Sequence, residues 1–260
     1  MRKYADLPYL ADGLKEHLLD VYLPDGEGRE YPVFLFFHGG GLTGGGKGIP
    51  GAPELTARGI ACASAAYRLY PRASYPDFVN DAADAVDALM HRMGDVIRPT
   101  AIYIGGASAG AYLSMMLCFA TQFLRARGIE PGEISGYFHD AGQPTVHFNV
   151  LKERGVDPRR VIVDEAAPLY YVGTEETYPP MMILTSDKDM ENRPEQLELL
   201  ISTLRHFRID PSLYTFYQYE GTHCQIDVMQ NEKGENLFGL KVAEFIHATE
   251  EKKKNDQAGA

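Results

Sequence analysis

A serine flanked by glycines is the clearest candidate for a reactive group in this chain. Gly106-Ala107-Ser108-Ala109-Gly110 is a G-x-S-x-G motif, and it lies between the apolar stretch 101–104 and a helical pattern that starts near Ala109. A serine on a sharp strand-to-helix turn projects its hydroxyl above a sheet, and flanking glycines let the strained backbone pass without Cβ clashes. We therefore predict that Ser108 is a nucleophile, rather than part of an ordinary helix N-terminus with glycines for close packing.

A second glycine-rich segment follows the apolar stretch 33–37. The run His38-Gly39-Gly40-Gly41 leaves backbone N–H groups unshielded, and these groups, with that of Ala109, could stabilise the oxyanion of a tetrahedral intermediate. The competing interpretation is a phosphate-binding loop, because Gly44-Gly45-Gly46-Lys47-Gly48 follows. The sequence disfavours it, since no Lys-Ser/Thr pair ends this loop and prolines interrupt the helix that should open there.

A serine nucleophile needs a base and a group that fixes the tautomer of that base. Among the eight histidines His223 is the best placed, because it follows the strand-like stretch 213–219 and sites in open parallel sheets form at the carboxyl ends of strands. The acid should follow the preceding strand, where Asp187 and Asp189 both stand. The order of the three groups along the chain is then Ser, Asp, His.

Strand-like and helical stretches alternate along most of the chain, and they would position these groups. Helical spacing of apolar residues predicts helices at 77–93, 109–125, 197–207 and 238–249. Strands are predicted at 17–23, 31–37, 61–67, 101–104, 134–138, 181–185 and 213–219. Such alternation predicts an α/β fold with a mostly parallel central sheet and helices on both faces, formed by one domain over residues 1–249.

Two regions break the alternation. The interval His139–Tyr178 contains one predicted helix around 145–154, and we expect it to be an insertion that forms a lid or a substrate wall. Residues Glu250–Ala260 are charged and then small, and we expect a flexible tail.

The composition argues against several classes of protein. The 260 residues are 45% hydrophobic and 23% charged, which is typical of a globular protein with a sizeable core. The formal net charge of −11 argues against nucleic acid and anionic membrane surfaces as partners. Three cysteines without a C-x-x-C pair favour a reducing compartment and no zinc site, and no other metal or cofactor is expected.

Neither a leader nor a membrane span is expected. Asp6, Pro8 and Asp12 interrupt the first residues, so no signal peptide is recognised and a cytoplasmic location is expected. The stretch Thr100–Leu124 carries no charge and is long enough to cross a bilayer. Its glycines and serines favour a buried strand followed by a buried helix instead.

Taken together, these motifs resemble those of the α/β-hydrolase superfamily, and within it the esterases related to hormone-sensitive lipase. The resemblance spans roughly residues 17–246. It includes Tyr67-Arg68-Leu69-Tyr70-Pro71 and Tyr75-Pro76, which are similar to the Tyr-Arg-Leu-x-Pro segment and the following proline–aromatic dipeptide of that family. It implies that Ser108 is the nucleophile, that His223 is the general base, and that Asp189 rather than Asp187 is the orienting acid.

The same resemblance implies an oxyanion hole made by the amides of Gly40, Gly41 and Ala109, with Gly39 shaping it. Ala107 and Leu42 depart from the closest lipase-like members, and the short segment before the glycine run leaves little room for their helical cap. The more open site is similar to that of small esterases that remove acetyl or feruloyl groups from plant polysaccharides.

We therefore expect a metal-independent serine carboxylesterase that acts on short acyl esters of a carbohydrate or another bulky alcohol. A feruloyl or aryl esterase is the alternative within the same chemistry, and a non-catalytic receptor for a small ligand is the alternative from another class. The expected substrate wall is Leu42 together with polar and aromatic residues of the insertion: His139, Asp140, His147, Phe148, Tyr170 and Tyr171.

Overall fold

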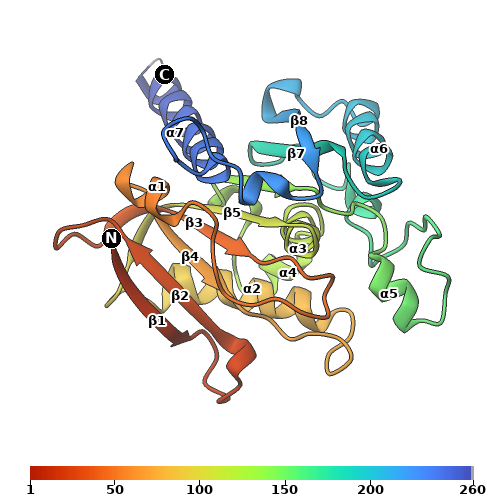
Figure 1. The fold of residues 1–260 in the computed structure, drawn as a ribbon, viewed down its shortest axis with the longest axis horizontal. Coiled ribbons are helices and arrows are strands. Elements are labelled where there is room, and N and C mark those ends of the chain that lie inside the picture. The colour runs from red at the N-terminus through yellow and green to blue at the C-terminus, as the bar shows by residue number, and fades with distance from the viewer. Residues whose placement is uncertain (259–260) are drawn as a thin grey trace.

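A computed structural model describes residues 1–258, and its centre is one sheet of eight strands (Figure 1). The strands lie in the order β1-β2-β4-β3-β5-β6-β7-β8, with β2 antiparallel to both of its neighbours and every pair from β4 to β8 parallel. The strands are β1 (Arg2–Pro8), β2 (Leu18–Leu23), β3 (Glu30–Phe37), β4 (Ala61–Ala65), β5 (Arg98–Ala107), β6 (Gly136–Asp140), β7 (Met181–Lys188) and β8 (Tyr214–Thr222). The predicted α/β class with a mostly parallel sheet is confirmed.

Helices cover both faces of this sheet. They are α1 (Ala52–Ala57), α2 (Asp77–His91), α3 (Ala109–Phe119), α4 (Gln122–Arg125), α5 (Phe148–Glu153), α6 (Arg193–His206) and α7 (Leu237–Ala258), and short 3₁₀ turns fill several connections. Alternate residues of β3 serve the two faces, as a doubly covered strand requires. Leu35 and Phe37 join the apolar cluster that includes α2, α3 and α6, whereas Phe34 and Phe36 join the cluster that includes α1 and α7.

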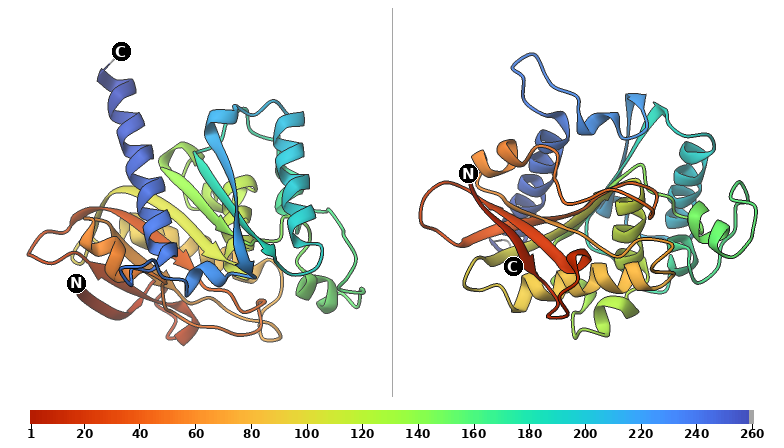
Figure 2. Two further views of the ribbon diagram at one scale, coloured as in Figure 1. Left: turned by 45° about the horizontal axis from the view of Figure 1, so that its top comes forward. Right: turned by 60° about the horizontal axis from the view of Figure 1, so that its bottom comes forward.

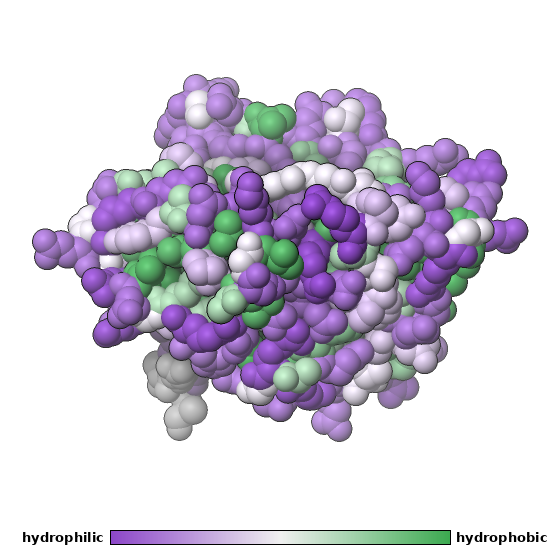
Figure 3. Space-filling view, turned by 90° about the horizontal axis from the view of Figure 1, so that it is seen from below, coloured by the Kyte–Doolittle hydropathy of each residue, from purple (hydrophilic) through white to green (hydrophobic). Residues whose placement is uncertain are grey.

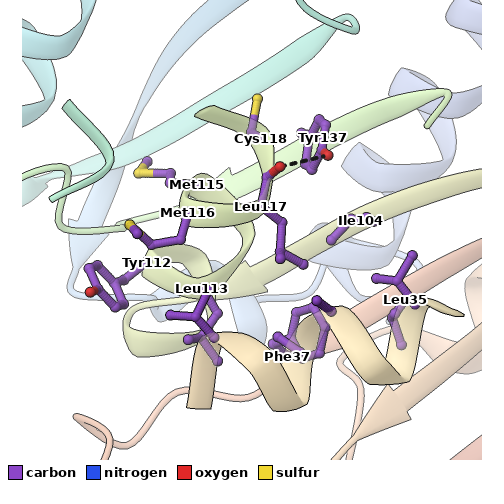
Figure 4. Close-up of a cluster of buried hydrophobic side chains, with 14 of the residues drawn as sticks. Leu35, Phe37, Ile104, Tyr112, Leu113, Met115, Met116, Leu117, Cys118 and Tyr137 are labelled. Atoms are coloured by element: carbon purple, nitrogen blue, oxygen red, sulfur yellow. Dashed lines mark hydrogen bonds between the residues drawn. The ribbon is translucent and has the colours of Figure 1, made fainter. Parts of the chain in front are cut away.

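Helix α3 is buried along its whole length, and this burial fixes the turn that precedes it. Figure 4 shows its Leu113 and Leu117 grouped with Phe37 of β3 and Ile104 of β5. The hydroxyl of Tyr137 in β6 donates to the carbonyl oxygen of Leu117 at 3.3 Å. Contacts with three neighbouring strands therefore hold α3 in place.

Several elements differ from the predicted ones. Strand β1 and helix α1 were not predicted: β1 is an edge strand whose side chains are mostly exposed, so it lacks apolar alternation, and α1 starts at prolines that suggested a break. The predicted helix 109–125 is two helices, α3 and α4, separated at Ala120-Thr121.

The expected flexible tail at 250–260 is corrected for its described part. Helix α7 continues to Ala258 and extends beyond the sheet (Figure 2), so residues 250–258 are helical; residues 259–260 lie outside the described residues. Residues 251–256 are all exposed to solvent, where charge is well tolerated, whereas Glu250 accepts a hydrogen bond from the hydroxyl of Tyr103 at 2.6 Å.

No helix within residues 1–258 is both long and apolar enough to cross a membrane. The uncharged stretch 100–124 is divided among β5, α3 and α4, as the sequence favoured. On the face shown in Figure 3, hydrophilic residues cover most of the surface and hydrophobic ones form smaller separate groups.

Candidate active site

Ser108 lies on the turn between β5 and α3 with a positive φ of 54°. For a residue other than glycine such a backbone costs on the order of 1 kcal/mol or more. The turn is tight because α3 starts close to β3: a Cβ on Gly110 would lie 1.8 Å from the carbonyl oxygen of Phe37, and one on Gly106 would lie 2.3 Å from the carbonyl carbon of Gly110. The two glycines of the motif are therefore required by this close approach.

A chain of two hydrogen bonds joins Ser108 to His223 and Asp189, although these residues follow three different strands. The Oγ of Ser108 lies 2.8 Å from Nε2 of His223, and Nδ1 of His223 lies 2.5 Å from Oδ1 of Asp189. The parallel pairing of β5, β6, β7 and β8 brings the carboxyl ends of these strands to one edge of the sheet. That edge is where ligands bind in open α/β sheets.

The side chain of Asp189 is fully shielded from solvent and well supplied with donors. Its Oδ1 also accepts from the backbone N–H of Met190 at 2.7 Å, and its Oδ2 accepts from the hydroxyls of Thr185 and Ser186, both at 3.2 Å. Burial by itself would raise the pKa of Asp189, but the contact with His223 and the backbone donors outweigh it, and the pKa is lowered. The carboxyl is therefore ionised at neutral pH.

The other candidate acid, Asp187, has a different neighbour. It is exposed, and its Oδ1 accepts from the backbone N–H of Gly221 at 2.7 Å. This bond ties the turn after β7 to the end of β8, two residues before His223. The structure thus places Asp189, and not Asp187, against the imidazole.

The glycine run lies at the end of β3, beside Ser108. Gly39, Gly40 and Gly41 line a cavity of about 340 Å³ together with Ser108 and His223, which we call the serine cavity. Gly40 needs its freedom from a side chain, because its φ is 112° and a Cβ there would lie 2.2 Å from the carbonyl oxygen of Gly44. The loop is therefore a tight turn that faces the serine.

Three backbone N–H groups near the serine hydroxyl have no partner. Among the hydrogen bonds of residues 1–258, none uses the N–H of Gly40, Gly41 or Ala109 as a donor. Ala109 follows Ser108 directly, so its N–H belongs to the turn that carries the serine. Unpartnered donors at such a position can stabilise a negatively charged oxygen.

Residues that the sequence did not connect with this loop hold it in place. The ring of Tyr67 stacks on that of His38, with 4.4 Å between the ring centroids, and the hydroxyl of Tyr67 donates to the carbonyl oxygen of His38 at 2.7 Å. The Nδ2 of Asn149, in α5, donates to the carbonyl oxygen of Gly41. The Tyr67–Pro71 motif thus supports the glycine run, and no sequence pattern pointed to Asn149.

The phosphate-loop interpretation of Gly44–Gly48 finds no support in the surroundings of its lysine. The ammonium of Lys47 forms ion pairs with Asp6 and Asp20, the latter at 2.5 Å. The hydroxyl of Ser64 accepts from the N–H of Gly48 at 3.0 Å. These contacts fix the end of the loop against β2 and β4 and occupy the only cation in it.

Five of the expected wall residues do not line the serine cavity, and this expectation is corrected for them. Leu42, His139 and Asp140 are buried, with no more than 1% of their surface exposed, and Tyr170 is exposed but does not line the serine cavity. Tyr171 does not line it either, and its hydroxyl donates to the carbonyl oxygen of Glu165 at 3.0 Å. His139 and Asp140 were misplaced since they belong to β6 and not to the insertion.

The insertion does reach the serine cavity through Phe148, at the start of α5. Met190, Cys224 and Asp227 also line this cavity, and each stands within four residues of Asp189 or His223. The sequence analysis missed these three residues, although their closeness along the chain to Asp189 or His223 could have identified them. His147, in contrast, is buried, and burial lowers its pKa to about 3.

A pair of carboxyl groups lies next to the site. Asp140 is fully buried, and neither of its carboxyl oxygens nor Oδ1 of Asp227 has a hydrogen-bond partner among the described residues. Burial raises the pKa of Asp227 to about 7, and burial together with the nearby Asp227 raises that of Asp140. Residues 1–258 contain no group of three or more His, Cys, Asp and Glu side chains arranged to hold a metal ion.

The chain is similar to esterases in sequence and in fold. The family model BD-FAE matches residues 19–149, which is half of the chain. A probable isoprenylcysteine alpha-carbonyl methylesterase of Oryza sativa subsp. japonica is 30% identical over 150 residues, which are 53% of this chain and 36% of that protein. The chain thus spans about a third of the length of this curated relative.

Two solved structures cover nearly all of the chain. Esterase B from Lactobacillus rhamnosis has a TM-score of 0.76 at 15% identity, over 98% of this chain and 88% of that one. A truncated carbohydrate esterase from gut microbiota has a TM-score of 0.75 at 17% identity, over 96% of each chain. At these identities the likeness shows the fold, which is that of the α/β-hydrolases. With the family match, it follows that this chain belongs to the BD-FAE family, among the esterases of the α/β-hydrolase fold.

Proposed function

We propose that this protein is a serine carboxylesterase in which Ser108 is the nucleophile, His223 the general base and Asp189 the acid that orients the base. The observation that carries the proposal is the pair of hydrogen bonds that links Oγ of Ser108, both ring nitrogens of His223 and a carboxylate oxygen of Asp189. Membership of an esterase family supports it.

In the first half of the reaction, Oγ of Ser108 forms a bond to the ester carbonyl carbon while its proton passes to Nε2 of His223. The negative carbonyl oxygen of the tetrahedral intermediate accepts hydrogen bonds from the N–H groups of Gly40, Gly41 and Ala109. The bond from carbon to the alcohol oxygen then breaks, and Nε2 gives its proton to that oxygen. The products of this half are the free alcohol and an acyl group on Ser108.

Water completes the reaction by the same steps in reverse order. Nε2 of His223 removes a proton from the water as its oxygen bonds to the acyl carbon, and the bond to Ser108 breaks as the serine regains its proton. Asp189 keeps a proton on Nδ1, so that Nε2 is free to accept one, and it stabilises the imidazolium formed on the way. Its lowered pKa suits this role, because the carboxyl must stay negative.

For the substrate, we propose a short acyl group, such as acetyl, on a carbohydrate or another bulky alcohol. The serine cavity is small, about 340 Å³, and the glycine run forms one of its sides, which favours a small acyl group. The fold is shared with a carbohydrate esterase, which supports a sugar alcohol. Residues 1–249 then act as one catalytic domain, to which the insertion contributes Phe148 as substrate wall.

The aryl or feruloyl alternative has one observation in its favour: Phe148 and Met190 give the serine cavity an apolar side on which an aromatic ring could pack. A non-catalytic receptor is the weaker alternative. Such a protein has no use for a strained serine hydrogen-bonded to an imidazole, which costs stability and serves catalysis.

A panel of esters tests these proposals. Wild-type protein and Ser108→Ala are compared on 4-nitrophenyl acetate, butyrate and octanoate, and on acetylated and feruloylated sugars. We expect wild-type activity to fall with acyl length and to be higher on acetylated than on feruloylated sugar. Ser108→Ala should lose about 10⁴-fold or more in kcat, since removing a triad nucleophile typically costs that much or more.

Ser74→Ala is the matched control, because Ser74 is an exposed serine far along the chain from the triad. It should retain wild-type activity. Absence of hydrolysis by folded wild-type protein on every ester would favour the receptor, and a preference for feruloylated sugar would replace the acetyl proposal with the aryl one.

A further inference from the structure

A second cavity of about 320 Å³ adjoins the serine cavity, and Phe148 and Met190 line both. It lies between the insertion and the start of α6, on the side of the sheet where Figure 1 shows α5 and α6. We call it the arginine cavity, because three of its lining residues are Arg159, Arg160 and Arg193. No step proposed above uses it.

Arg193 places a cation at the base of this cavity. Only 3% of its surface is exposed, and its two terminal nitrogens donate to neutral oxygens, the carbonyl of Ala141 at 2.5 Å and Oε1 of Gln143 at 3.2 Å. Within the described part of the chain, no carboxylate oxygen lies within 4.0 Å of its guanidinium. Burial lowers the pKa of Arg193, and it outweighs the charge of Asp189, which acts on Arg193 from a distance. A buried charge with no carboxylate in contact is costly, so an anion bound in the cavity would compensate it.

The start of α6 adds a second, independent attraction for an anion. Helix α6 has 14 residues, and its first residues line the arginine cavity. Asn192 stands at the N-cap position, but its side chain accepts no hydrogen bond from the first turn. The N-terminus of a helix carries partial positive charge, which favours an anion. In α6 this charge acts mainly through the helix dipole, because the N–H of Arg193 already donates to the carbonyl oxygen of Met190 and Pro194 has no N–H, and Glu195 in the first turn opposes it.

Two exposed arginines stand at the rim. Arg159 forms an ion pair with Asp157 at 2.6 Å, whereas for the side chain of Arg160 no ion pair is found among residues 1–258. Glu191 also lines the cavity and opposes them, but it is exposed to solvent. The chain as a whole has a net charge of −11, whereas the lining of this cavity contains three arginines and one glutamate and is therefore locally positive.

We propose that the arginine cavity is a subsite for a carboxylate carried by the ester substrate, whose carbonyl group lies at Ser108. This inference rests on the proposed esterase function and narrows its substrate class to anionic esters. The carboxylate can belong to the acid part, as in a half-ester of a dicarboxylic acid, or to the alcohol part, as in an acetylated uronic acid. Both present the same chemistry to the arginines, and Phe148 and Met190 contact the part of the substrate in between.

The test compares anionic with neutral esters of matched size in wild type and in Arg159→Gln/Arg160→Gln. One arm uses the 4-nitrophenyl half-ester of glutaric acid against 4-nitrophenyl pentanoate. The other uses an O-acetylated methyl glucuronoside against the matching methyl glucoside. The measured quantity is the ratio of kcat/KM for the anionic ester to kcat/KM for the neutral one. We expect the double variant to lower this ratio about tenfold in one arm, since each partly exposed charge pair contributes a factor of about three to five.

Arg72→Gln is the matched control, because the side chain of Arg72 is 84% exposed and pairs only with Glu16. It should leave both ratios at the wild-type value. The arm in which the ratio falls identifies the part of the ester that carries the carboxylate. An unchanged ratio in both arms would overturn the proposed subsite and leave the esterase function standing. If wild-type protein hydrolyses no neutral ester, the proposed function itself is overturned.

A moderate salt concentration should also weaken the preference for anionic esters, because salt screens the charges of the exposed arginines. A preference that does not change with salt would count against a role of these arginines.

Discussion

At the scale of single residues, the choice between two carboxylates decides how the imidazole is held. Asp189 contacts Nδ1 of His223, whereas Asp187 accepts from the N–H of Gly221. An acid that fixes the tautomer of the base contributes roughly 10⁴ in kcat, so Asp189→Asn should approach that loss. Asp187→Asn should cost at most about 1 kcal/mol of stability and little activity, because it removes one exposed hydrogen bond.

Steady-state kinetics and urea unfolding of the two variants check this assignment, and each variant is the control for the other. A kinetic loss in Asp187→Asn with an active Asp189→Asn would show that the acid has been assigned two residues too late.

The buried carboxyl of Asp227 should make the free energy of unfolding depend on pH. Its pKa is raised to about 7 by burial, so the folded protein holds its proton over a range in which the unfolded chain has lost it. A group of this kind makes the free energy of unfolding decrease as pH rises from about 4 to about 7. Asp227→Asn removes the cost of ionising the buried group, and it should stabilise the protein at pH 8 by an amount on the order of 1 to 3 kcal/mol.

At pH 4 most of this gain should disappear, because Asp227 is then protonated in the folded protein and partly protonated in the unfolded chain, where its pKa is the ordinary 3.8. Urea unfolding of wild type and variant at the two pH values measures the difference. A gain of equal size at pH 4 and pH 8 would show that ionisation of Asp227 is not its cause.

At the scale of elements, α5 connects the insertion to the glycine run through Asn149. Its amide holds the carbonyl oxygen of Gly41, and thereby the orientation of the peptide groups proposed as the oxyanion hole. Asn149→Ala should lower kcat about 10-fold with little change in KM, which is less than removing an oxyanion donor itself would cost. The melting temperature should stay near that of wild type, because Asn149 is only partly buried.

Asn149→Gln, which keeps the amide, is the conservative variant and should recover part of the loss in kcat. Equal rates for Asn149→Ala and wild type would show that the loop keeps its geometry without this contact.

Phe148, the neighbouring residue, should affect the choice of substrate more than the rate. It lines the serine cavity, whereas Tyr170 of the same insertion is 57% exposed and does not line it. Phe148→Ala should change the ranking of esters with bulky acyl or alcohol groups and alter activity on 4-nitrophenyl acetate less than threefold. Tyr170→Ala should change neither. An equal loss on every ester would indicate misfolding and not a substrate wall.

Elements with strong local signals were predictable from the sequence, and those that depend on distant contacts were not. The spacing relative to apolar strands indicated Ser108, His223 and the turn that holds Asp187 and Asp189, because parallel strands bring their carboxyl ends to one edge. The choice of Asp189 over Asp187 came from the family resemblance. The insertion lacked such a pattern, so His139 and Asp140 were assigned to it although they end β6. The bond from Asn149 to Gly41 spans 108 residues, and no local rule predicts it.

At the scale of the whole molecule, the proposed mechanism needs only groups of the chain itself. The proposed nucleophile and base line the serine cavity, the proposed acid is hydrogen-bonded to that base, and the proposed amide donors flank the serine. Activity should therefore survive dialysis against EDTA, measured on 4-nitrophenyl acetate before and after. Loss of activity with EDTA, and its recovery with one divalent ion, would contradict this prediction.

The central proposal is that Oγ of Ser108 is the nucleophile that forms the covalent bond to the substrate, and covalent labelling tests it most directly. Wild-type protein is incubated with diethyl 4-nitrophenyl phosphate, which phosphorylates activated serines. The masses of the intact protein and of its proteolytic peptides are then measured by mass spectrometry. We expect one diethyl phosphoryl group per chain on the peptide that contains Ser108, loss of esterase activity in proportion to labelling, and no label on Ser108→Ala. Labelling at another residue, or an active enzyme that takes up no label at Ser108, would contradict it.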